Sequence, residues 1–104
     1  MQFQLTSQVL EVCVLSVLSR EDTYGYKLTQ GIKTILSVSE STLYPVLRRL
    51  QTDGSLFTYD EAFDGRNRRY YKLTDSGSVK LAEYLTLWEQ HKNKVDRIVK
   101  EGLN

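Results

Sequence analysis

Four stretches of the chain carry apolar residues at helical spacing, and one segment between them alternates as β-strands do. The first stretch predicts a helix over residues 5–18, because apolar positions recur every three or four residues: Leu5, Val9, Val12, Cys13 and Val17. A second side of the same helix is also apolar, with Leu10, Val14, Leu15 and Leu18. We therefore expect this helix to be buried around most of its circumference.

A second and a third helix are predicted, each after a residue that can cap its first turn. Thr23 precedes the second helix, whose apolar face carries Tyr24, Leu28, Ile32, Ile35 and Leu36. Ser39 precedes the third helix, which ends near Gly54 and has an inner face of Leu43, Val46, Leu47 and Leu50. Pro45 removes one backbone hydrogen bond from the third helix, so its first turn is either distorted or begins later.

An antiparallel hairpin is predicted next, because residues 56–61 and 68–73 are rich in aromatic and β-branched side chains. Residues 62–67 form a long tip in this interpretation. Alternation along the return strand places Tyr71 and Leu73 on one face of the hairpin and Tyr70 and Lys72 on the other.

The last predicted helix follows Thr74, which can cap it, and runs to about Glu101. At 1.5 Å per residue it is about 40 Å long, more than a domain of this size covers alone. Along this helix, apolar residues recur at alternating steps of three and four, which is the spacing of a coiled-coil seam. The seam ends at Gly102. We expect a second copy of the chain to cover this seam through Leu81, Tyr84, Leu85, Trp88, His91, Val95 and Ile98.

These elements predict a mainly α fold with a small β-hairpin (α+β), in which residues 1–74 form a winged helix-turn-helix and residues 75–104 a dimerisation helix. The outward face of the third helix carries Ser41, Thr42, Pro45, Arg48, Arg49 and Thr52, with Tyr44 at its boundary. Small side chains let such a helix enter the major groove of DNA, while Arg48 or Arg49 reaches a guanine edge or a phosphate. A solvated helix face explains these two arginines equally well.

Composition indicates one soluble globular domain, and charge is informative only through its placement. The 104 residues are 26% charged and 40% hydrophobic, with a net charge of +1. Five of the seven arginines lie in two short segments: Arg48, Arg49, Arg66, Arg68 and Arg69. Acidic residues balance them locally, so a basic surface requires a geometry that separates the two signs.

The predicted hairpin tip carries the second group of arginines. Asp64 and Gly65 form a turn that directs Arg66, Arg68 and Arg69 away from the body, toward a minor groove or flanking phosphates. Solubility explains one exposed arginine readily, but three within four residues favour a nucleic-acid partner.

Other classes of function find little support. Cys13 is the only cysteine, so no intramolecular disulfide forms and we expect a cytoplasmic protein, without a membrane segment or an export signal. His91 is the only histidine and has no second ligand at metal-binding spacing, so neither a metal nor another cofactor is expected. A phosphate-binding glycine loop and a nucleophile elbow are also missing, and we do not expect an enzyme.

Several short motifs together resemble the PadR family of bacterial transcriptional regulators. They are Thr-Leu-Tyr-Pro-Val-Leu-Arg-Arg-Leu at 42–50, Asp-Gly at 53–54, Arg-Arg-Tyr-Tyr-Lys-Leu-Thr at 68–74 with Gly77, and Tyr-Gly-Tyr at 24–26. The resemblance covers nearly the whole chain, and it is closest to the short subfamily with a single C-terminal helix. Each motif alone is weak, whereas their combination is specific.

The resemblance implies a homodimeric repressor that binds an inverted repeat of double-stranded DNA and is released by a small molecule. It places Thr42, Tyr44, Pro45 and Arg48 in the major groove, with Arg66 and Arg68 on the wing. Trp88 matches a tryptophan that lines a planar aromatic pocket in multidrug-binding members, although a large aromatic residue on a heptad seam is more often simple packing. A winged-helix module that binds an acidic protein instead of DNA is the alternative.

Overall fold

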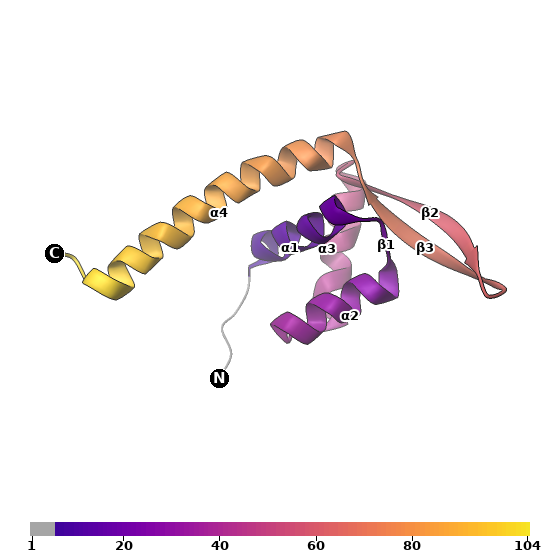
Figure 1. Ribbon diagram of the computed structural model, residues 1–104, viewed down its shortest axis with the longest axis horizontal. Coiled ribbons are helices and arrows are strands. Elements are labelled where there is room, and N and C mark those ends of the chain that lie inside the picture. Colours follow the sequence, from indigo (N-terminus) through magenta and orange to yellow (C-terminus); the bar gives the residue numbers. More distant parts are fainter. Residues whose placement is uncertain (1–5) are drawn as a thin grey trace.

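The computed structural model describes residues 6–104 and confirms the mainly helical α+β architecture (Figure 1). Three helices form the body, and a hairpin and a long fourth helix leave it in opposite directions. The elements in order are α1 (Ser7–Arg20), β1 (Thr23–Tyr24), α2 (Gly25–Leu36), α3 (Glu40–Thr52), β2 (Leu56–Phe63), β3 (Arg66–Leu73) and α4 (Asp75–Glu101). This is the winged helix-turn-helix order.

The core lies between α1 and α3 and is almost entirely aliphatic. The predicted inner face of α3 is buried as expected: Leu43, Val46, Leu47 and Leu50. From α1 the buried residues are Leu10, Val14, Leu15 and Leu18, and Leu28 and Ile32 of α2 complete this side of the core. Ser39 caps α3 by accepting a hydrogen bond from the backbone N–H of Thr42, and Pro45 lies inside a helix that continues through it.

Two details of the first helices differ from the prediction. Helix α1 continues to Arg20 instead of ending at Leu18, and Leu5 lies outside the described residues. Thr23 does not cap α2, because Thr23 and Tyr24 pair with Tyr71 and Tyr70 of β3 as a short third strand. Pairing with the edge of β3 satisfies backbone groups that a capping conformation would leave to solvent. On α2, Ile35 is 83% exposed and is not part of the buried face.

The hairpin is longer and its turn tighter than predicted. Strands β2 and β3 pair from Leu56 with Leu73 as far as Phe63 with Arg66, so only Asp64 and Gly65 form the turn. Both have positive φ values, 50° and 75°. An Asp-Gly pair in a two-residue turn of this kind matches the natural twist of the two strands. The predicted six-residue tip was therefore wrong, and the sheet order is β1-β3-β2.

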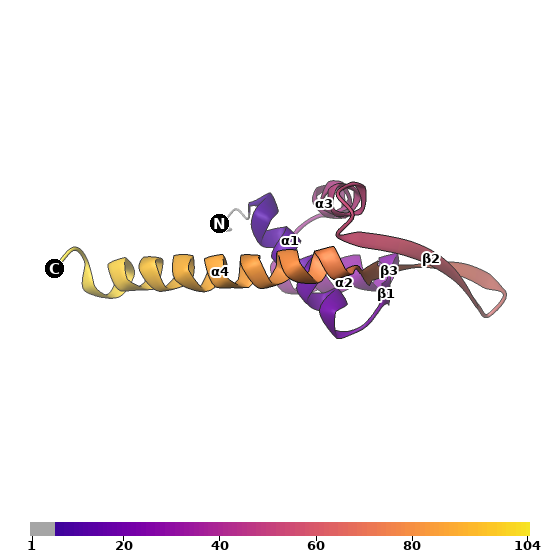
Figure 2. The ribbon, with the colours of Figure 1, turned by 90° about the horizontal axis from the view of Figure 1, so that it is seen from above.

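Helix α4 begins after Thr74, whose side chain accepts a hydrogen bond from the backbone N–H of Gly77, which confirms the predicted cap. Its first turns lie against α1, and its second half continues alone as a rod beyond the body (Figure 2). The molecule is accordingly elongated, with extents of 61 × 33 × 21 Å. Among residues 6–104, no helix has both the length and the apolar character needed to cross a membrane.

Candidate nucleic-acid interface

The outward face of α3 is exposed where the sequence placed it. Ser41, Thr42, Tyr44 and Pro45 all lie on the solvent side of the helix. The Ser41 and Thr42 hydroxyl groups each lie 2.9 Å from the Ser39 hydroxyl, so the first turn of α3 presents a compact group of small polar side chains. Such a surface can approach the floor of a groove closely, with hydroxyl groups that still have hydrogen-bonding capacity.

Arg48 and Arg49 are neighbours in sequence but have different electrostatic surroundings. The Nε of Arg49 lies 3.6 Å from Glu11 Oε1, a carboxylate that comes from α1. Arg48 is exposed, and no ion pair joins it to any carboxylate of residues 6–104. The positive charge of Arg48 is therefore available on the outer face of α3, whereas that of Arg49 is partly compensated.

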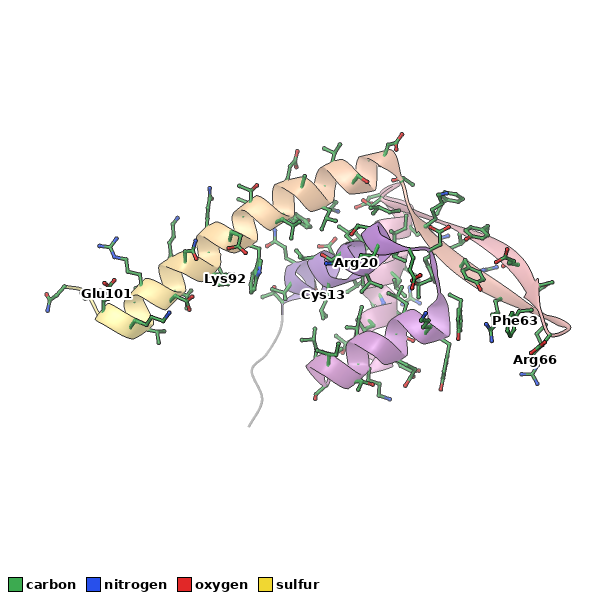
Figure 3. The ribbon with its side chains drawn as sticks, in the orientation of Figure 1. Cys13, Arg20, Phe63, Arg66, Lys92 and Glu101 are labelled. Carbon is green, nitrogen blue, oxygen red and sulfur yellow. The ribbon has the colours of Figure 1, made fainter. Side chains whose placement is uncertain are left out.

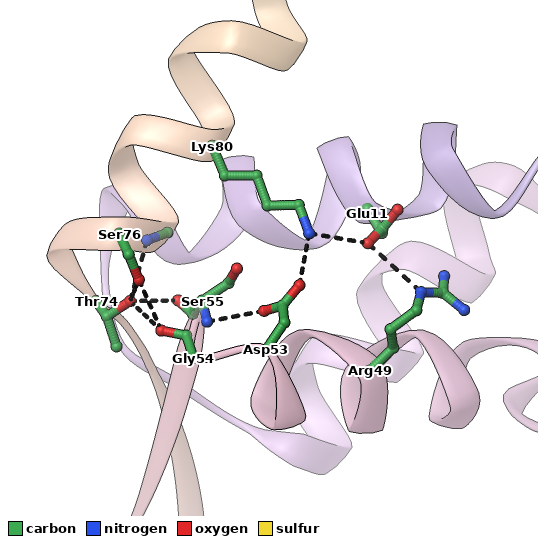
Figure 4. Close-up of polar contacts among 9 residues, drawn as sticks. Glu11, Arg49, Asp53, Gly54, Ser55, Thr74, Ser76 and Lys80 are labelled. Atoms are coloured by element: carbon green, nitrogen blue, oxygen red, sulfur yellow. Dashed lines mark hydrogen bonds and ion pairs between the residues drawn. The ribbon is translucent and has the colours of Figure 1, made fainter.

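Glu11 belongs to a cluster of charges that connects three helices (Figure 4). It is buried, and its Oε1 lies 3.4 Å from Lys80 Nζ of α4. Lys80 also contacts Asp53 Oδ2 at 2.6 Å, and Asp53 Oδ1 accepts a 2.9 Å hydrogen bond from the backbone N–H of Ser55. We call Glu11, Arg49, Asp53 and Lys80 the charge cluster.

The contacts within the charge cluster favour the charged forms of Asp53 and Lys80. Burial would raise the pKa of Asp53, but hydrogen bonds from Lys80 and Ser55 outweigh it and lower that pKa. Burial would likewise lower the pKa of Lys80, yet the hydrogen bond to Asp53 and the negative charge of Glu11 raise it overall. Asp53 and Lys80 are thus charged at neutral pH, and the formal charges of the four members, two acidic and two basic, sum to zero.

Arg66 lies at the far end of the wing, and its side chain extends off the hairpin (Figure 3). It is exposed, and none of the carboxylates that the structure describes forms an ion pair with it. Arg66 thus matches the sequence prediction of a free basic group at the tip.

The other two wing arginines are engaged within the chain. The guanidinium carbon of Arg68 lies 4.3 Å from the centre of the Tyr24 ring and 3.9 Å from that of Phe63. These distances are typical of cation–π contacts, so Arg68 does not point freely away from the body as the sequence suggested. Arg69 is exposed, with its Nε 3.5 Å from Asp60 Oδ1 on the neighbouring strand.

An aromatic layer on one face of the sheet fixes the wing to the body. Tyr70 lies between Tyr24 and Tyr59, with ring centres 5.7 Å and 5.4 Å apart. The Tyr59 hydroxyl donates a 2.7 Å hydrogen bond to Asp22, which raises the pKa of Tyr59 to about 12. Sequence reasoning missed Tyr59 and Asp22, because their contact joins residues 37 positions apart.

The predicted seam on α4 divides into two parts. Leu81 is only 8% exposed and Tyr84 packs against the core, so the chain itself covers the start of the seam. Leu81 is therefore a core residue, in contrast to its assignment to an intermolecular surface. Farther along, the seam residues are exposed: Leu85, Trp88, His91, Val95 and Ile98.

Trp88 lines a hollow of about 770 Å³ between α1 and α4. Val9 and Val12 of α1 form one wall, and Leu87 and His91 of α4 lie beside Trp88 on the other. The sequence predicted a first helix buried around most of its circumference, yet Val9 and Val12 are only half-buried and line this hollow. Cys13 packs partly against the core, and burial raises the pKa of its thiol, which favours the protonated form.

Comparison with known proteins gives a consistent result. Residues 14–83 match the family described as "Transcriptional regulator PadR-like family". The chain is similar to a crystal structure from Streptococcus mutans UA159, with 39% identity, a TM-score of 0.90, and coverage of 100% of this chain and 98% of that one. It is also similar to a PadR-like transcriptional regulator of Bacillus cereus, with 33% identity, a TM-score of 0.80, and coverage of 88% and 92%.

A relative from Mycobacterium tuberculosis adds a sequence match. It is described as the transcriptional regulator Rv3488 and is 41% identical over 63 residues, which are 60% of this chain and 59% of that protein.

Proposed function

The chain belongs to the PadR-like family of transcriptional regulators, and from this premise we propose that it is a homodimeric repressor that binds an inverted repeat in DNA. Regulators of this family bind DNA, and α3 with the wing supplies the elements for doing so. In this proposal α3 enters the major groove and the wing contacts the flanking backbone or minor groove.

One observation carries the proposal: Arg48 and Arg66 are exposed without ion pairs, one on α3 and one at the wing tip. DNA-binding proteins make two kinds of contact, to the bases and to the phosphate backbone. A free arginine on a helix suits the first kind, and a free arginine on a projecting hairpin suits the second. Ser41, Thr42, Tyr44 and Pro45 complete the face of α3 that meets the bases. Arg49, Arg68 and Arg69 flank this surface, and their charges already have partners within the chain.

The second half of α4 supports the homodimer. Trp88, Val95 and Ile98 form an exposed apolar stripe on a helix that extends beyond the body, and an amphipathic helix of this kind is stabilised when a second copy covers it. A two-fold axis through the paired helices relates two α3 helices. Such dimers bind half-sites about 34 to 36 Å apart, which requires an inverted repeat.

The test begins with selection of bound sites from random duplex DNA, followed by titration of the selected operator. Arg48→Ala should weaken operator binding by about 1–3 kcal/mol if Arg48 reads a base. Arg66→Ala should weaken operator and random DNA similarly and flatten the dependence of affinity on salt. If both variants bind both DNAs as the wild type does, these residues do not form the interface.

The alternative is a protein-interaction module whose arginines meet an acidic partner. It predicts no binding to any duplex at low salt, where sequence-independent attraction is strongest. A gel shift at low ionic strength therefore separates the two functions before an operator is known.

The hollow beside Trp88 favours a ligand-responsive repressor. Its walls combine an indole with aliphatic side chains of α1 and α4, which suits a planar aromatic effector. Because Trp88 is the only tryptophan, its fluorescence reports on this hollow alone. Quenching by planar aromatic compounds supports an effector site, whereas unchanged fluorescence across a broad panel indicates that Trp88 only packs against neighbouring side chains.

A further inference from the structure

We propose that Glu11 is a specificity-determining residue that withholds the charge of Arg49 from DNA. Glu11 lies on α1, outside the proposed interface, and acts through its ion pair with Arg49 on α3. The inference rests on the proposed function of α3 as the DNA-reading helix. It concerns whether Arg48 or Arg49 contributes more to the attraction between α3 and DNA phosphates.

The burial of Glu11 explains why it must hold a cation. Its side chain is 8% exposed, and a carboxylate removed from water is costly unless a positive group lies beside it. Two cations lie within 4 Å, Lys80 at 3.4 Å and Arg49 at 3.6 Å. Both contacts reach the same oxygen, Oε1, so the two cations share one carboxylate.

Lys80 does not neutralise Glu11 alone, because Asp53 competes for the same ammonium group. The Lys80 Nζ lies 2.6 Å from Asp53 Oδ2, closer than its 3.4 Å separation from Glu11. Lys80 thus shares one positive charge between two carboxylates, and Arg49 supplies the second positive charge beside Glu11 (Figure 4). The charge cluster is neutral only when Arg49 is counted as part of it.

Arg49 is held by charge without being locked in place. Its 3.6 Å separation from Glu11 is longer than a hydrogen bond, and its side chain is 46% exposed. A phosphate could therefore compete for it, but only by leaving Glu11 with less compensation. This competition lowers the attraction of Arg49 for DNA relative to that of Arg48, which has no competing carboxylate among residues 6–104.

Masking one charge affects random DNA more than the operator. Attraction between basic side chains and phosphates supplies nearly all of sequence-independent binding, while base contacts distinguish the operator. By masking Arg49, Glu11 weakens binding to random DNA and leaves base reading by Arg48 untouched. The ratio of specific to non-specific affinity rises as a result.

The experiment measures binding to a random-sequence duplex as a function of salt. Full-length wild type is compared with Glu11→Gln, which keeps the shape of the side chain but removes its charge, with Arg49→Gln, and with the double variant. Freeing Arg49 should steepen the slope of log K against log salt by about 0.9 per bound copy in Glu11→Gln. The double variant should lose this increase, because the released charge is then absent.

The adjacent pair supplies a matched control and a test that does not depend on the folding of Glu11→Gln. Arg48→Gln should flatten the slope by about 0.9 per bound copy if Arg48 meets a phosphate in random DNA. Arg49→Gln should change the slope by less than half as much. Equal effects of the two arginine variants would overturn the masking role, as would weaker DNA binding by a folded Glu11→Gln, which is what a purely structural Glu11 predicts.

Failure of the proposed function has a different signature. If the wild type binds no duplex at low salt, α3 is not a DNA-reading helix and the inference is refuted together with that function. If the wild type binds and only the Glu11 and Arg49 variants depart from expectation, the proposed function stands and the masking role is wrong.

Discussion

The first half of α4 lies against the body of the molecule, whereas its second half extends beyond it (Figure 2). Apolar side chains recur at the same spacing in both halves, but Leu81 is 8% exposed and Ile98 is 58% exposed. The first half contributes to the core of the chain, whereas the second half leaves its apolar stripe exposed. In the proposed dimer, one continuous heptad pattern would serve an intramolecular and an intermolecular surface in succession.

The charged side chains of the two halves differ in the same way. In the docked half, Lys80 joins Glu11 and Asp53, which belong to α1 and to the end of α3. In the projecting half, the ion pairs are local, between Lys92 and Glu89 and between Arg97 and Glu101. Exposed pairs of this local kind contribute little to stability, so only the docked half connects its charges to the fold.

The largest expected effect is that of Leu81→Ala, because it opens a cavity where α4 meets the core. We expect a loss of about 2–5 kcal/mol in the free energy of unfolding, measured by urea denaturation. Leu87→Ala is the matched control, since Leu87 is exposed on the same helix, and it should cost less than about 0.5 kcal/mol. Equal losses in the two variants would contradict the division of α4 into a docked and a projecting half.

Gly77→Ala is expected to have the next largest effect. A Cβ at this position would lie 2.2 Å from the backbone oxygen of Ser55 and 2.7 Å from Leu73 Cδ1. Because a backbone atom cannot move aside cheaply, we expect a loss of about 1–3 kcal/mol in urea denaturation. Gly31→Ala on α2 is the control: its added methyl group would meet no other part of the fold within 4 Å, so it should stabilise the helix by up to about 1 kcal/mol.

The sequence predicted the apolar stripe of α4, but it did not predict where along α4 the stripe passes from the core to the exposed half. The spacing of Leu81, Trp88 and Ile98 predicted one seam, since periodicity identifies a face of a helix without identifying what covers it. Leu81 is buried because α1 lies beside the first turns of α4. The apolar second side of α1 was visible in the sequence, whereas its packing partner was not.

In the candidate interface, too, the sequence predicted which face of a helix a residue lies on but not which residue of another element it contacts. Exposure of Arg48 followed from its place opposite the leucines of α3. The partner of Arg49 is Glu11, which lies on another helix 38 residues earlier, and no local pattern announces such a pair. For the hairpin, in contrast, the Asp-Gly pair at 64–65 was a local signal for a two-residue turn. The predicted six-residue tip did not make use of that signal.

Ile98→Glu tests the projecting half. A charge placed in the exposed stripe should weaken self-association at least about tenfold, equivalent to about 1.4 kcal/mol, because two copies would bring two carboxylates into an apolar contact. Sedimentation across a concentration series measures this change. Val79→Glu is the matched control, since Val79 is an exposed apolar residue outside the stripe, on the side of α4 opposite Trp88, and self-association should survive there. A monomeric wild type would refute the proposed dimer.

The smallest expected effect is the pH dependence of the charge cluster. The pKa of Asp53 is lowered in the folded chain, so its contribution is complete above the unfolded pKa of about 3.9 and is lost as pH falls through the folded value. The pKa of Lys80 is raised, so its contribution is complete below about 10.4 and is lost as pH rises through the folded value. The contact between Asp53 and Lys80 therefore stabilises the docked half between these limits.

Urea denaturation from pH 7 to pH 2.5 measures the acid side of this window, with Asp53→Asn as the comparison. Wild type should exceed Asp53→Asn by less than about 1 kcal/mol at pH 7, because Asp53 is partly exposed and solvent screens the pair. The difference should shrink below about pH 4, as Asp53 becomes protonated. Glu89→Gln, which removes the ion pair with Lys92, should stay close to wild type throughout, since that pair joins no second element of the fold. A constant difference between wild type and Asp53→Asn down to pH 2.5 would mean that the charge of Asp53 does not help to dock α4.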